Sequence, residues 1–477
     1  MTLNSRIEKD SLGEMEVPAD AYYGIQTQRA ICNFPVSGHR ASPEFIRAYI
    51  LVKKAAALTN LELGVLDRVR GDAIVAAADE VLSGLSGKYS DQFPVDIFQA
   101  GAGTSFNMNV NEVLANRALE ILGRNRGDYS FLSPNDHVNM SQSTNDTFPT
   151  ASSIAVIFAA DRLIDVLASL AEAFQAKALE FSRIPKSGRT HLMDALPVTL
   201  GDEFGAYAAA LLRASGRIKE RRNDLLELPL GGTATGTGAN TDPKYRELVI
   251  SKLSELCKLP FRKASNSFEA LQSRSQLAAF SGALRELALE LIRIANDLRL
   301  LNAGPTSGIS EIELPAVQPG SSMMPGKYNP VMAECLDMIG FQIVGNDTAV
   351  AFATQAGQLE LNVMTPVITS NILMSVSLLT NYLPIFQTRC VEGIKANEDR
   401  CRAYLELNPT LVTFLAPKLG YLNAAEIAKE VLDKRIPVKE VLVMRGFLSK
   451  EEADELLKIE NLLQFPGSEK SKTSLKE

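Results

Sequence analysis

The sequence predicts a mainly α-helical protein built around a bundle of long antiparallel helices. Apolar residues recur every three or four positions over long stretches, and glycine or proline follows these stretches. With 46% hydrophobic residues in 477, the chain can bury a large core. Several helices of more than about twenty residues, close together in the sequence, are typical of an elongated antiparallel bundle.

The N-terminal part predicts shorter elements. Loops with glycine and proline separate short helices over about the first 140 residues, and residues 6–17 are expected to form a small strand pair. A long helix is then expected from about Ala151 to Phe181, because Pro149 marks a helix start and Thr150 suits an N-cap.

Two apolar seams define the next long helices. One has heptad spacing and ends before Pro229 and the glycine-rich loop 231–238; its members are Phe204, Leu211, Ile218 and Leu225. The other alternates steps of three and four and stops at Gly304; its members are Leu277, Phe280, Leu284, Leu287, Leu291, Ile294, Leu298 and Leu301. Such long seams are seldom covered within one chain, which favours self-association into a symmetric homo-oligomer.

Residues 346–390 are expected to supply two more long helices, kinked or divided at Pro366. After about Cys401 the chain returns to short helices. Residues 466–477 are polar and are expected to be disordered. Two later helices are expected to begin with capping boxes, formed by Asn423 with Glu426 and by Ser449 with Glu452.

Composition and charge exclude several classes of function. The 49 Lys and Arg against 56 Asp and Glu leave a net charge of −7 without a basic block, so nucleic-acid binding is not expected. No apolar stretch reaches the roughly 18 residues of a membrane span, and residues 1–9 lack the apolar core of a signal peptide. We therefore expect a cytoplasmic protein. Its 5 cysteines show no CxxC spacing and are expected to be free thiols.

Four segments are too rich in small hydroxyl and amide residues to be core helix: 101–109, 141–146, 188–191 and 318–330. Hydroxyls, amides and free backbone N–H groups at helix starts suit a carboxylate or a phosphate. For any one segment, a helix cap or a surface loop is the alternative. Four such segments together favour a ligand site.

The segment 318–330 predicts a mobile lid that carries catalytic groups. Glycines and prolines flank the pair Ser321-Ser322, while Lys327 and Asn329 add a cation and an amide two residues apart. A solvated loop charge is the alternative for Lys327. The chain has no G-x-S-x-G elbow and no glycine motif after a strand, so serine hydrolases and dinucleotide-binding enzymes are not expected.

The loop sequence Gly320-Ser-Ser-Met-Met-Pro-Gly-Lys-Tyr-Asn-Pro330 resembles the GSSxMPxKxNP signature of the aspartase/fumarase superfamily. The resemblance extends over nearly the whole chain, from residues 6–10 to 420–421. Within the superfamily, three segments resemble the aspartate ammonia-lyases and differ from the fumarases: residues 91–96, 103–105 and 142–146.

The resemblance also implies an architecture. It implies a three-domain subunit, with an N-terminal mixed, mostly helical domain at 1–143, a central long-helix bundle at 144–399, and a small helical domain with a disordered tail at 400–477. The long helices of four subunits would form the core of a homotetramer. Each active site would be built from three subunits.

The activity implied by the resemblance is the reversible deamination of L-aspartate to fumarate and ammonia, without a metal or an organic cofactor. Removal of the weakly acidic Cβ proton leaves an aci-carboxylate, whose negative charge must be stabilised. The family's roles, carried over to this sequence, make Ser321 the general base on the mobile loop. The alkoxide of Ser321 would need loop N–H groups and the charge of Lys327.

The same resemblance assigns the substrate contacts. The β-carboxylate would lie among Thr104, Ser143, Thr144 and Ser322. Lys327 and Asn329, assisted by Thr190, would hold the α-carboxylate. His191 would contact the departing ammonium together with Asn145 and Thr104. The alternative role for His191 is to orient the turn at Thr190.

Four positions depart from the family pattern, namely Met193, Thr306, Tyr328 and Ala416. Because some of them lie in or beside the lid and the substrate turns, they leave the substrate open. The alternatives are a fumarate hydratase, which would add water in place of ammonia, and a lyase for a related or N-substituted aspartate. A non-catalytic structural homologue is the alternative outside the enzymes.

Overall fold

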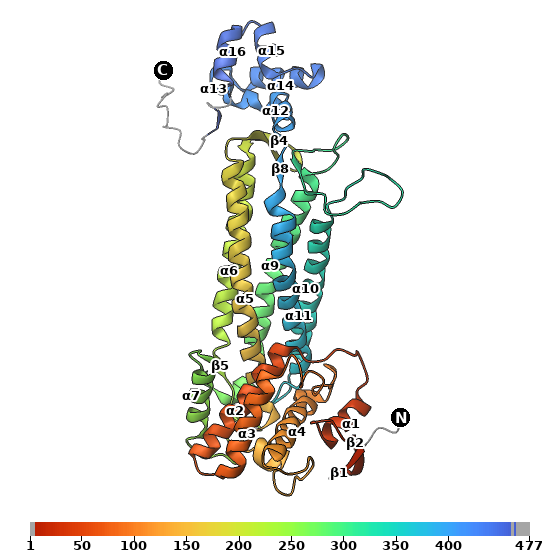
Figure 1. The fold of residues 1–477 in the computed structure, drawn as a ribbon. Coiled ribbons are helices and arrows are strands. Elements are labelled where there is room, and N and C mark those ends of the chain that lie inside the picture. The colour runs from red at the N-terminus through yellow and green to blue at the C-terminus, as the bar shows by residue number, and fades with distance from the viewer. Residues whose placement is uncertain (1–4, 459–461, 464–477) are drawn as a thin grey trace. The chain divides into compact units, whose positions relative to one another are not determined.

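The structure is a computed structural model that describes residues 5–458 and 462–463 (Figure 1). Most of the elements are helices. Within this described range the strands pair into four two-stranded sheets. The mainly α-helical class predicted from the sequence is confirmed.

The five longest described helices have 25 or more residues each: α5 (Thr144–Glu180), α6 (Leu200–Asp224), α9 (Ser275–Leu301), α10 (Val331–Gln355) and α11 (Thr365–Arg389). The residues of both predicted seams are buried. Pro366 lies in the first turn of α11, where a missing N–H costs no hydrogen bond, so the expected division falls before it.

Two predicted helix starts are wrong. Helix α5 begins at Thr144 and contains Pro149, while the hydroxyl of Thr150 donates to the backbone of Asp146 instead of capping the helix. The cap lies earlier, at Ser143, whose Oγ accepts from the N–H of Asn145 (3.2 Å), and the helix continues through Pro149 without the hydrogen bond that a proline cannot donate. Helix α14 (Tyr421–Lys434) likewise begins before Asn423.

Two other predictions for the chain ends have different outcomes. The capping box of Ser449 with Glu452 is confirmed at the start of α16 (Lys450–Leu456). The expected disorder of 466–477 lies outside the described residues.

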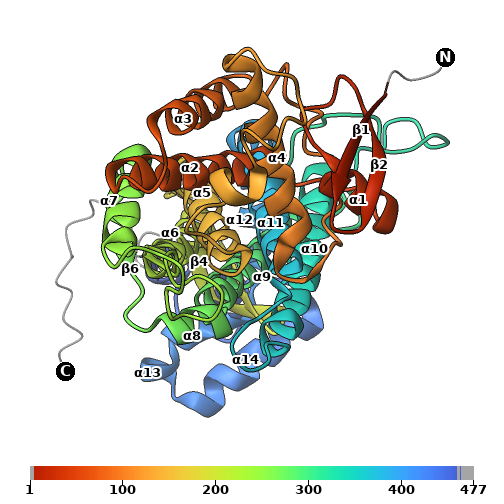
Figure 2. The same ribbon diagram turned by 90° about the horizontal axis from the view of Figure 1, so that it is seen from below.

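The chain forms two compact units, and the first comprises the described parts of 1–165, 216–288 and 341–380. In it α2 packs against α3 and α7, and α3 packs against α4 (Figure 2). Edge-to-face and tilted ring contacts join Phe45, Tyr49, Phe106 and Phe148 in its core. Its shorter elements are β1 (Ser5–Asp10), β2 (Gly13–Pro18), α1 (Ile25–Asn33), α2 (Pro43–Glu62), α3 (Arg68–Ser83), α4 (Thr104–Ile121), β5 (Glu227–Leu228), α7 (Tyr245–Cys257), β6 (Arg262–Lys263) and α8 (Ser267–Gln272).

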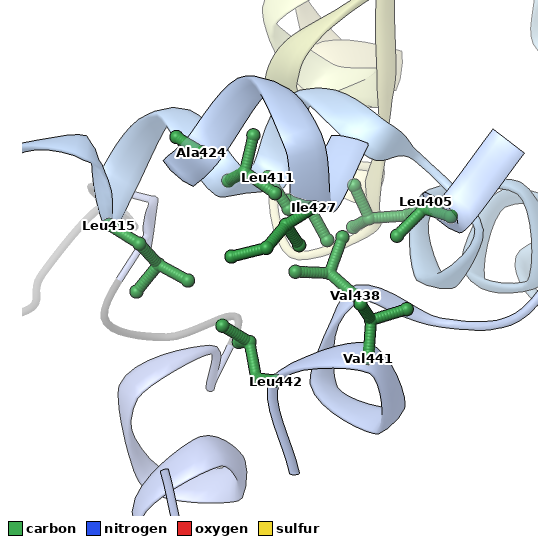
Figure 3. Packing of buried hydrophobic residues seen from close by; sticks show 10 residues of the cluster. Leu405, Leu411, Leu415, Ala424, Ile427, Val438, Val441 and Leu442 are labelled. Carbon is green, nitrogen blue, oxygen red and sulfur yellow. The ribbon is translucent and has the colours of Figure 1, made fainter. Parts of the chain in front are cut away.

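The second unit comprises the described parts of 166–215, 289–340 and 381–477. Its C-terminal helices enclose a small core of leucine, valine, isoleucine and alanine side chains between 405 and 442 (Figure 3). The predicted division into three consecutive domains stays a prediction. The shorter elements of this unit are β3 (Pro185–Thr190), β4 (Met193–Thr199), β7 (Ile312–Glu313), β8 (Lys395–Ala396), α12 (Glu398–Glu406), α13 (Ala416–Leu419), α15 (Val438–Met444) and α16 (Lys450–Leu456).

Candidate active site

Ser143, Thr144 and Asn145 stand at the N-terminal end of α5. The Ser143 hydroxyl accepts a hydrogen bond from the backbone N–H of Asn145 (3.2 Å), and the N–H of Ser143 donates to the carboxylate of Asp146 (3.0 Å). The second bond is the one that the acidic residue of a capping box makes. The positive end of the helix dipole makes this turn suitable for an anion.

Asp146 joins this turn to the glycine-rich loop 231–238. Its buried carboxylate accepts hydrogen bonds from the N–H groups of Gly231 (3.0 Å) and Thr233 (2.9 Å). The loop is also bonded to Asn145, whose Nδ2 donates to the carbonyl of Ala234 (2.8 Å). Burial raises the pKa of Asp146 to about 6, although the backbone N–H donors favour its ionised form.

A buried lysine on α2 supports the approach to α5. The Nζ atom of Lys53 donates to Oδ1 of Asn107 (2.7 Å), to Oδ1 of Asn139 (2.9 Å) and to Oε1 of Gln142 (3.0 Å). Burial lowers the pKa of Lys53 to about 7, and the charge of Asp146 acts in the opposite direction. Since two of the three amides directly precede α5, Lys53 fixes the backbone that leads into this helix.

Thr104 is exposed and begins α4. The turn before it is left-handed at Ala102 (φ 61°) and at Gly103 (φ 87°). A Cβ atom on Gly103 would overlap the ring of Phe148 on α5. Glycine therefore allows the start of α4 to pack directly on α5, and this contact holds Thr104 beside the first turns of that helix.

Thr190 and His191 lie at the tip of the hairpin of β3 and β4. His191 (φ 56°) and Leu192 (φ 60°) both have left-handed backbone, as a type I′ turn requires. Such turns favour asparagine and glycine, so this pair is strained. The side chains from 190 to 194 are exposed, and both predicted site residues are therefore accessible to a ligand.

A buried ion-pair network holds strand β3 of this hairpin. Glu311 is fully buried and accepts from Nζ of Lys186 (2.8 Å) and from both terminal nitrogens of Arg189 (2.9 and 2.8 Å). Lys186 also pairs with Glu203 (2.6 Å). Because Glu311 lies on the segment that leads to the loop 318–330, the network ties the hairpin to the start of that loop.

The loop 318–330 is closed on itself by its own polar groups. The N–H of Gly320 donates to the carbonyl of Lys327 (2.8 Å), and the side-chain amide of Asn329 donates back to the carbonyl of Gly320 (2.8 Å). The Lys327 ammonium donates to Oδ1 of Asn329 (2.8 Å). The cation and the amide are thus held together as one group.

Ser321 sits within this loop with two donors on its hydroxyl oxygen. Its Oγ accepts hydrogen bonds from the backbone N–H groups of Met323 (3.1 Å) and Met324 (2.9 Å). Hydrogen bonds to the charged form of a group favour that form. The loop therefore has the donors that an alkoxide at Ser321 would need.

The family models identify the chain. One described as lyase matches residues 13–345, and one described as fumarase C C-terminus matches residues 411–464. The chain belongs to the aspartase/fumarase superfamily. The family predicted from the loop signature is thereby confirmed.

Relatives and a solved structure agree with this assignment. The aspartate ammonia-lyase of a Bacillus species is 48% identical over 457 residues, which are 96% of this lyase and 97% of that protein. A class II fumarate hydratase of Thermosynechococcus vestitus is 45% identical over 469 residues, which are 98% of this lyase and 100% of that protein.

The solved structure is that of a fumarate lyase:delta crystallin from Brucella melitensis bound to cobalt. It matches with a TM-score of 0.92 at 48% identity, covering 95% of this lyase and 98% of that chain. The prediction of a carbon–nitrogen lyase enzyme is confirmed by the family match and by the relatives named aspartate ammonia-lyase.

This lyase holds its predicted site residues in three groups, and their roles stay predictions. The first unit carries Thr104, Ser143, Thr144 and Asn145. In the second unit the hairpin carries Thr190 and His191, and the loop carries Ser321, Ser322, Lys327 and Asn329.

Two other kinds of site are absent from the part of the chain that the structure describes. The described residues contain no cluster of three or more His, Cys, Asp or Glu side chains placed to hold a metal ion. No described helix combines the length and the apolar character that crossing a bilayer requires. The expected free thiols are confirmed at Cys32, Cys257, Cys335, Cys390 and Cys401.

Three residues that organise these groups were not found from the sequence: Asp146, Lys53 and Glu311. The Ser143-x-x-Asp146 spacing is that of a capping box and could have pointed to Asp146. Lys53 and Glu311 carry no local signal, since their partners are far away in the sequence.

Proposed function

We propose that this lyase catalyses the reversible deamination of L-aspartate to fumarate and ammonia, as a cytoplasmic homotetramer without a metal or an organic cofactor. The observation that carries the proposal is the nearly full-length similarity to proteins named aspartate ammonia-lyase, at 46 to 48% identity. The polar segment 142–146, which resembles that branch of the superfamily, supports it.

In this proposal the Ser321 alkoxide takes a proton from Cβ of aspartate. The electron pair of the broken C–H bond moves into the β-carboxylate and forms the aci-carboxylate. When this intermediate collapses, the pair forms the Cα–Cβ double bond, the Cα–N bond breaks, and ammonia leaves. Thr104, Ser143, Thr144 and Ser322 would stabilise the charge that develops on the β-carboxylate.

The remaining groups have binding roles. The Lys327–Asn329 pair, assisted by Thr190, would hold the α-carboxylate. Asn145 and His191 would face the leaving nitrogen. The closed loop supports this arrangement because the serine and the lysine are held on one short segment.

Parallel assays with L-aspartate, L-malate and N-methyl-aspartate test the reaction, with fumarate followed by its absorbance. We expect the highest kcat/KM with L-aspartate. A hydratase is the second candidate, because a class II fumarate hydratase is also 45% identical over nearly the full length. Faster turnover of malate would replace the proposal by that candidate, and preference for the N-methyl substrate would redefine the substrate.

The base is tested by Ser321→Ala. We expect a large loss of kcat with substrate binding mostly kept, since the base acts in the transition state. Ser307→Ala, which changes an exposed serine of another loop in the same unit, is the control. Near-normal kcat in Ser321→Ala would exclude Ser321 as the base.

Shared sites are tested by mixing inactive subunits. Ser321→Ala and Asn145→Ala subunits, unfolded and reassembled together, should regain up to about a quarter of the activity if the two residues of a site come from different chains, as random mixing predicts. Ser321→Ala mixed with Lys327→Ala is the control, because both changes lie on one loop and no site can be repaired. A monomer in light scattering, or mixed tetramers without recovery, would contradict the proposal.

A further inference from the structure

We infer that Asp146 is a positioning residue which, through the loop 231–238, turns the side-chain oxygen of Asn145 toward the nitrogen of the substrate. The inference rests on the proposed deamination, because it concerns the group that would contact ammonia. Asp146 would thereby help to select ammonia, and not water, as the nucleophile that adds to fumarate. It is distinct from the residues that hold the carboxylates.

The carboxylate of Asp146 acts as a bridge within the first unit. Its Oδ1 accepts from the N–H of Ser143 (3.0 Å), and its Oδ2 accepts from the N–H groups of Gly231 (3.0 Å) and Thr233 (2.9 Å). The side chain is fully buried, so water does not compete for these bonds. One residue therefore connects the start of α5 to a loop more than eighty residues later in the chain.

The loop has the backbone that such a bridge requires. Gly231 (φ 86°) and Thr233 (φ 54°) are both left-handed, which aims two nearby N–H groups at one carboxylate oxygen. A side chain at 231 would collide with Arg246 of α7. The left-handed conformation of a buried threonine is strained, and the bonds to Asp146 hold it in place.

This bridge fixes the position of the backbone carbonyl of Ala234. Ala234 follows Thr233 directly, and its oxygen accepts from Nδ2 of Asn145 (2.8 Å). A carbonyl can only accept, so it selects the NH₂ end of the amide. A flipped amide would lose this bond and place two oxygens against each other.

The selected orientation fits an amine substrate. With its NH₂ group occupied by Ala234, Asn145 presents its oxygen, and an amide oxygen is an acceptor. Ammonium has only donors, and ammonia needs an acceptor to orient its N–H bonds for attack on fumarate. Dicarboxylates without an amine gain nothing from this oxygen. The Asp146 bridge should thus affect binding of the nitrogen and leave the binding of the carboxylates nearly unchanged.

Asp146→Asn tests the inference with little change of shape. The asparagine oxygen can keep the bond from the N–H of Ser143, and its NH₂ group then faces the N–H groups of Gly231 and Thr233, so the contacts that are lost are those with the loop. Measured in the direction of ammonia addition, the KM for ammonia should rise about tenfold or more, as for a lost hydrogen bond to a charged group, and the KM for fumarate should change less than about threefold. Inhibition by succinate, which lacks the amine, should stay within the same limit.

Asp161→Asn is the matched control. Asp161 lies on the same helix and is bonded to the side chain of Arg222 (2.8 Å), with 47% of its side chain exposed. We expect both KM values to match those of the wild type. Equal rises of the two KM values in Asp146→Asn, or a loss of kcat alone, would show a general structural role and overturn the inference.

Thr233→Gly decides the question if Asp146→Asn does not fold. Glycine accepts the left-handed backbone, keeps the N–H and the partner Asp146, and loosens only the loop. The KM for ammonia should rise severalfold with that for fumarate unchanged; an unchanged KM for ammonia would overturn the inference. A wild-type enzyme that adds no ammonia to fumarate would refute the proposed function first, and the inference with it.

Discussion

Replacing Glu311 by glutamine should destabilise the protein by removing a single buried charge. Glu311 accepts from Lys186 (2.8 Å) and from both terminal nitrogens of Arg189 (2.9 and 2.8 Å), and none of its surface is exposed. Glutamine keeps the shape and one oxygen. Its NH₂ group, however, must face one of the two cations, and Arg189 loses the carboxylate that neutralises it.

The magnitude follows from the partners that remain. Breaking a buried ion pair by removing one side costs roughly 3–5 kcal/mol. Lys186 keeps its bond to Glu203 (2.6 Å), and the glutamine oxygen still accepts one bond, so the cost should be at the lower end, about 3 kcal/mol. For an exposed pair the corresponding loss is only about 0–1 kcal/mol.

Urea unfolding at a fixed protein concentration measures this difference. With a slope of about 3 kcal/mol per molar urea, the midpoint of Glu311→Gln should fall by about 1 M. The control is Glu290→Gln in the same unit, whose partner Arg293 lies at 2.9 Å with 46% of its side chain exposed. Equal midpoints for the two variants would refute the idea that the Glu311 network stabilises the unit.

Three further predictions concern single positions. Lys327→Ala should raise the KM for aspartate about ten- to a hundredfold, as expected for a lost charge-assisted contact. Lys327→Arg should restore little of this loss, because the planar guanidinium does not replace a point charge. If the KM of Lys327→Ala stays within about a factor of two of the wild-type value, Lys327 is a solvated loop charge. Gly103→Ala should lower the unfolding free energy by about 1–3 kcal/mol more than Gly123→Ala does. Both glycines are left-handed (φ 87° and 70°), but only at Gly103 would the new Cβ overlap a ring, that of Phe148. Equal losses of unfolding free energy in the two variants, measured by thermal unfolding, would contradict this packing. The last concerns pH: burial lowers the pKa of Lys53 to about 7, so between about pH 7 and 9 the unfolded chain binds more protons than the folded one and the wild type should gain stability as the pH rises. When urea midpoints are plotted against pH, Lys53→Met should lose this rise of stability between about pH 7 and 9. The control Lys54→Met, which removes a lysine whose partner Asp79 is 55% exposed, should keep the rise. The same pH dependence in Lys53→Met and in the wild type would mean that Lys53 keeps its ordinary pKa.

The long helices could be predicted because their signal is periodic and local. The seam from Leu277 to Leu301 is buried throughout on one helix, as its spacing indicates. The start of α5 could not be placed correctly, since Pro149 and Thr150 suggest a helix start there, whereas the helix already begins at Thr144 with the capping interaction of Asp146. Local propensity is a weak guide when such a cap is supplied nearby.

The candidate site was predicted in its motifs but not in its supports. The Ser321 loop has a long signature and also forms a closed polar loop in the structure. The contacts of Asp146 with Gly231 and of Lys53 with Gln142 join residues 85 and 89 positions apart. No pattern within a short window records such contacts, because they arise only when distant segments pack together.

The tip of the β3–β4 hairpin has a consequence for engineering this enzyme. A histidine and a leucine occupy two left-handed positions where asparagine and glycine fold at lower cost. A stability-driven redesign would therefore replace them early and would gain thermal tolerance from the change. It would also erase the one exposed imidazole proposed to face the substrate, so a screen for heat resistance alone would select against turnover at this turn.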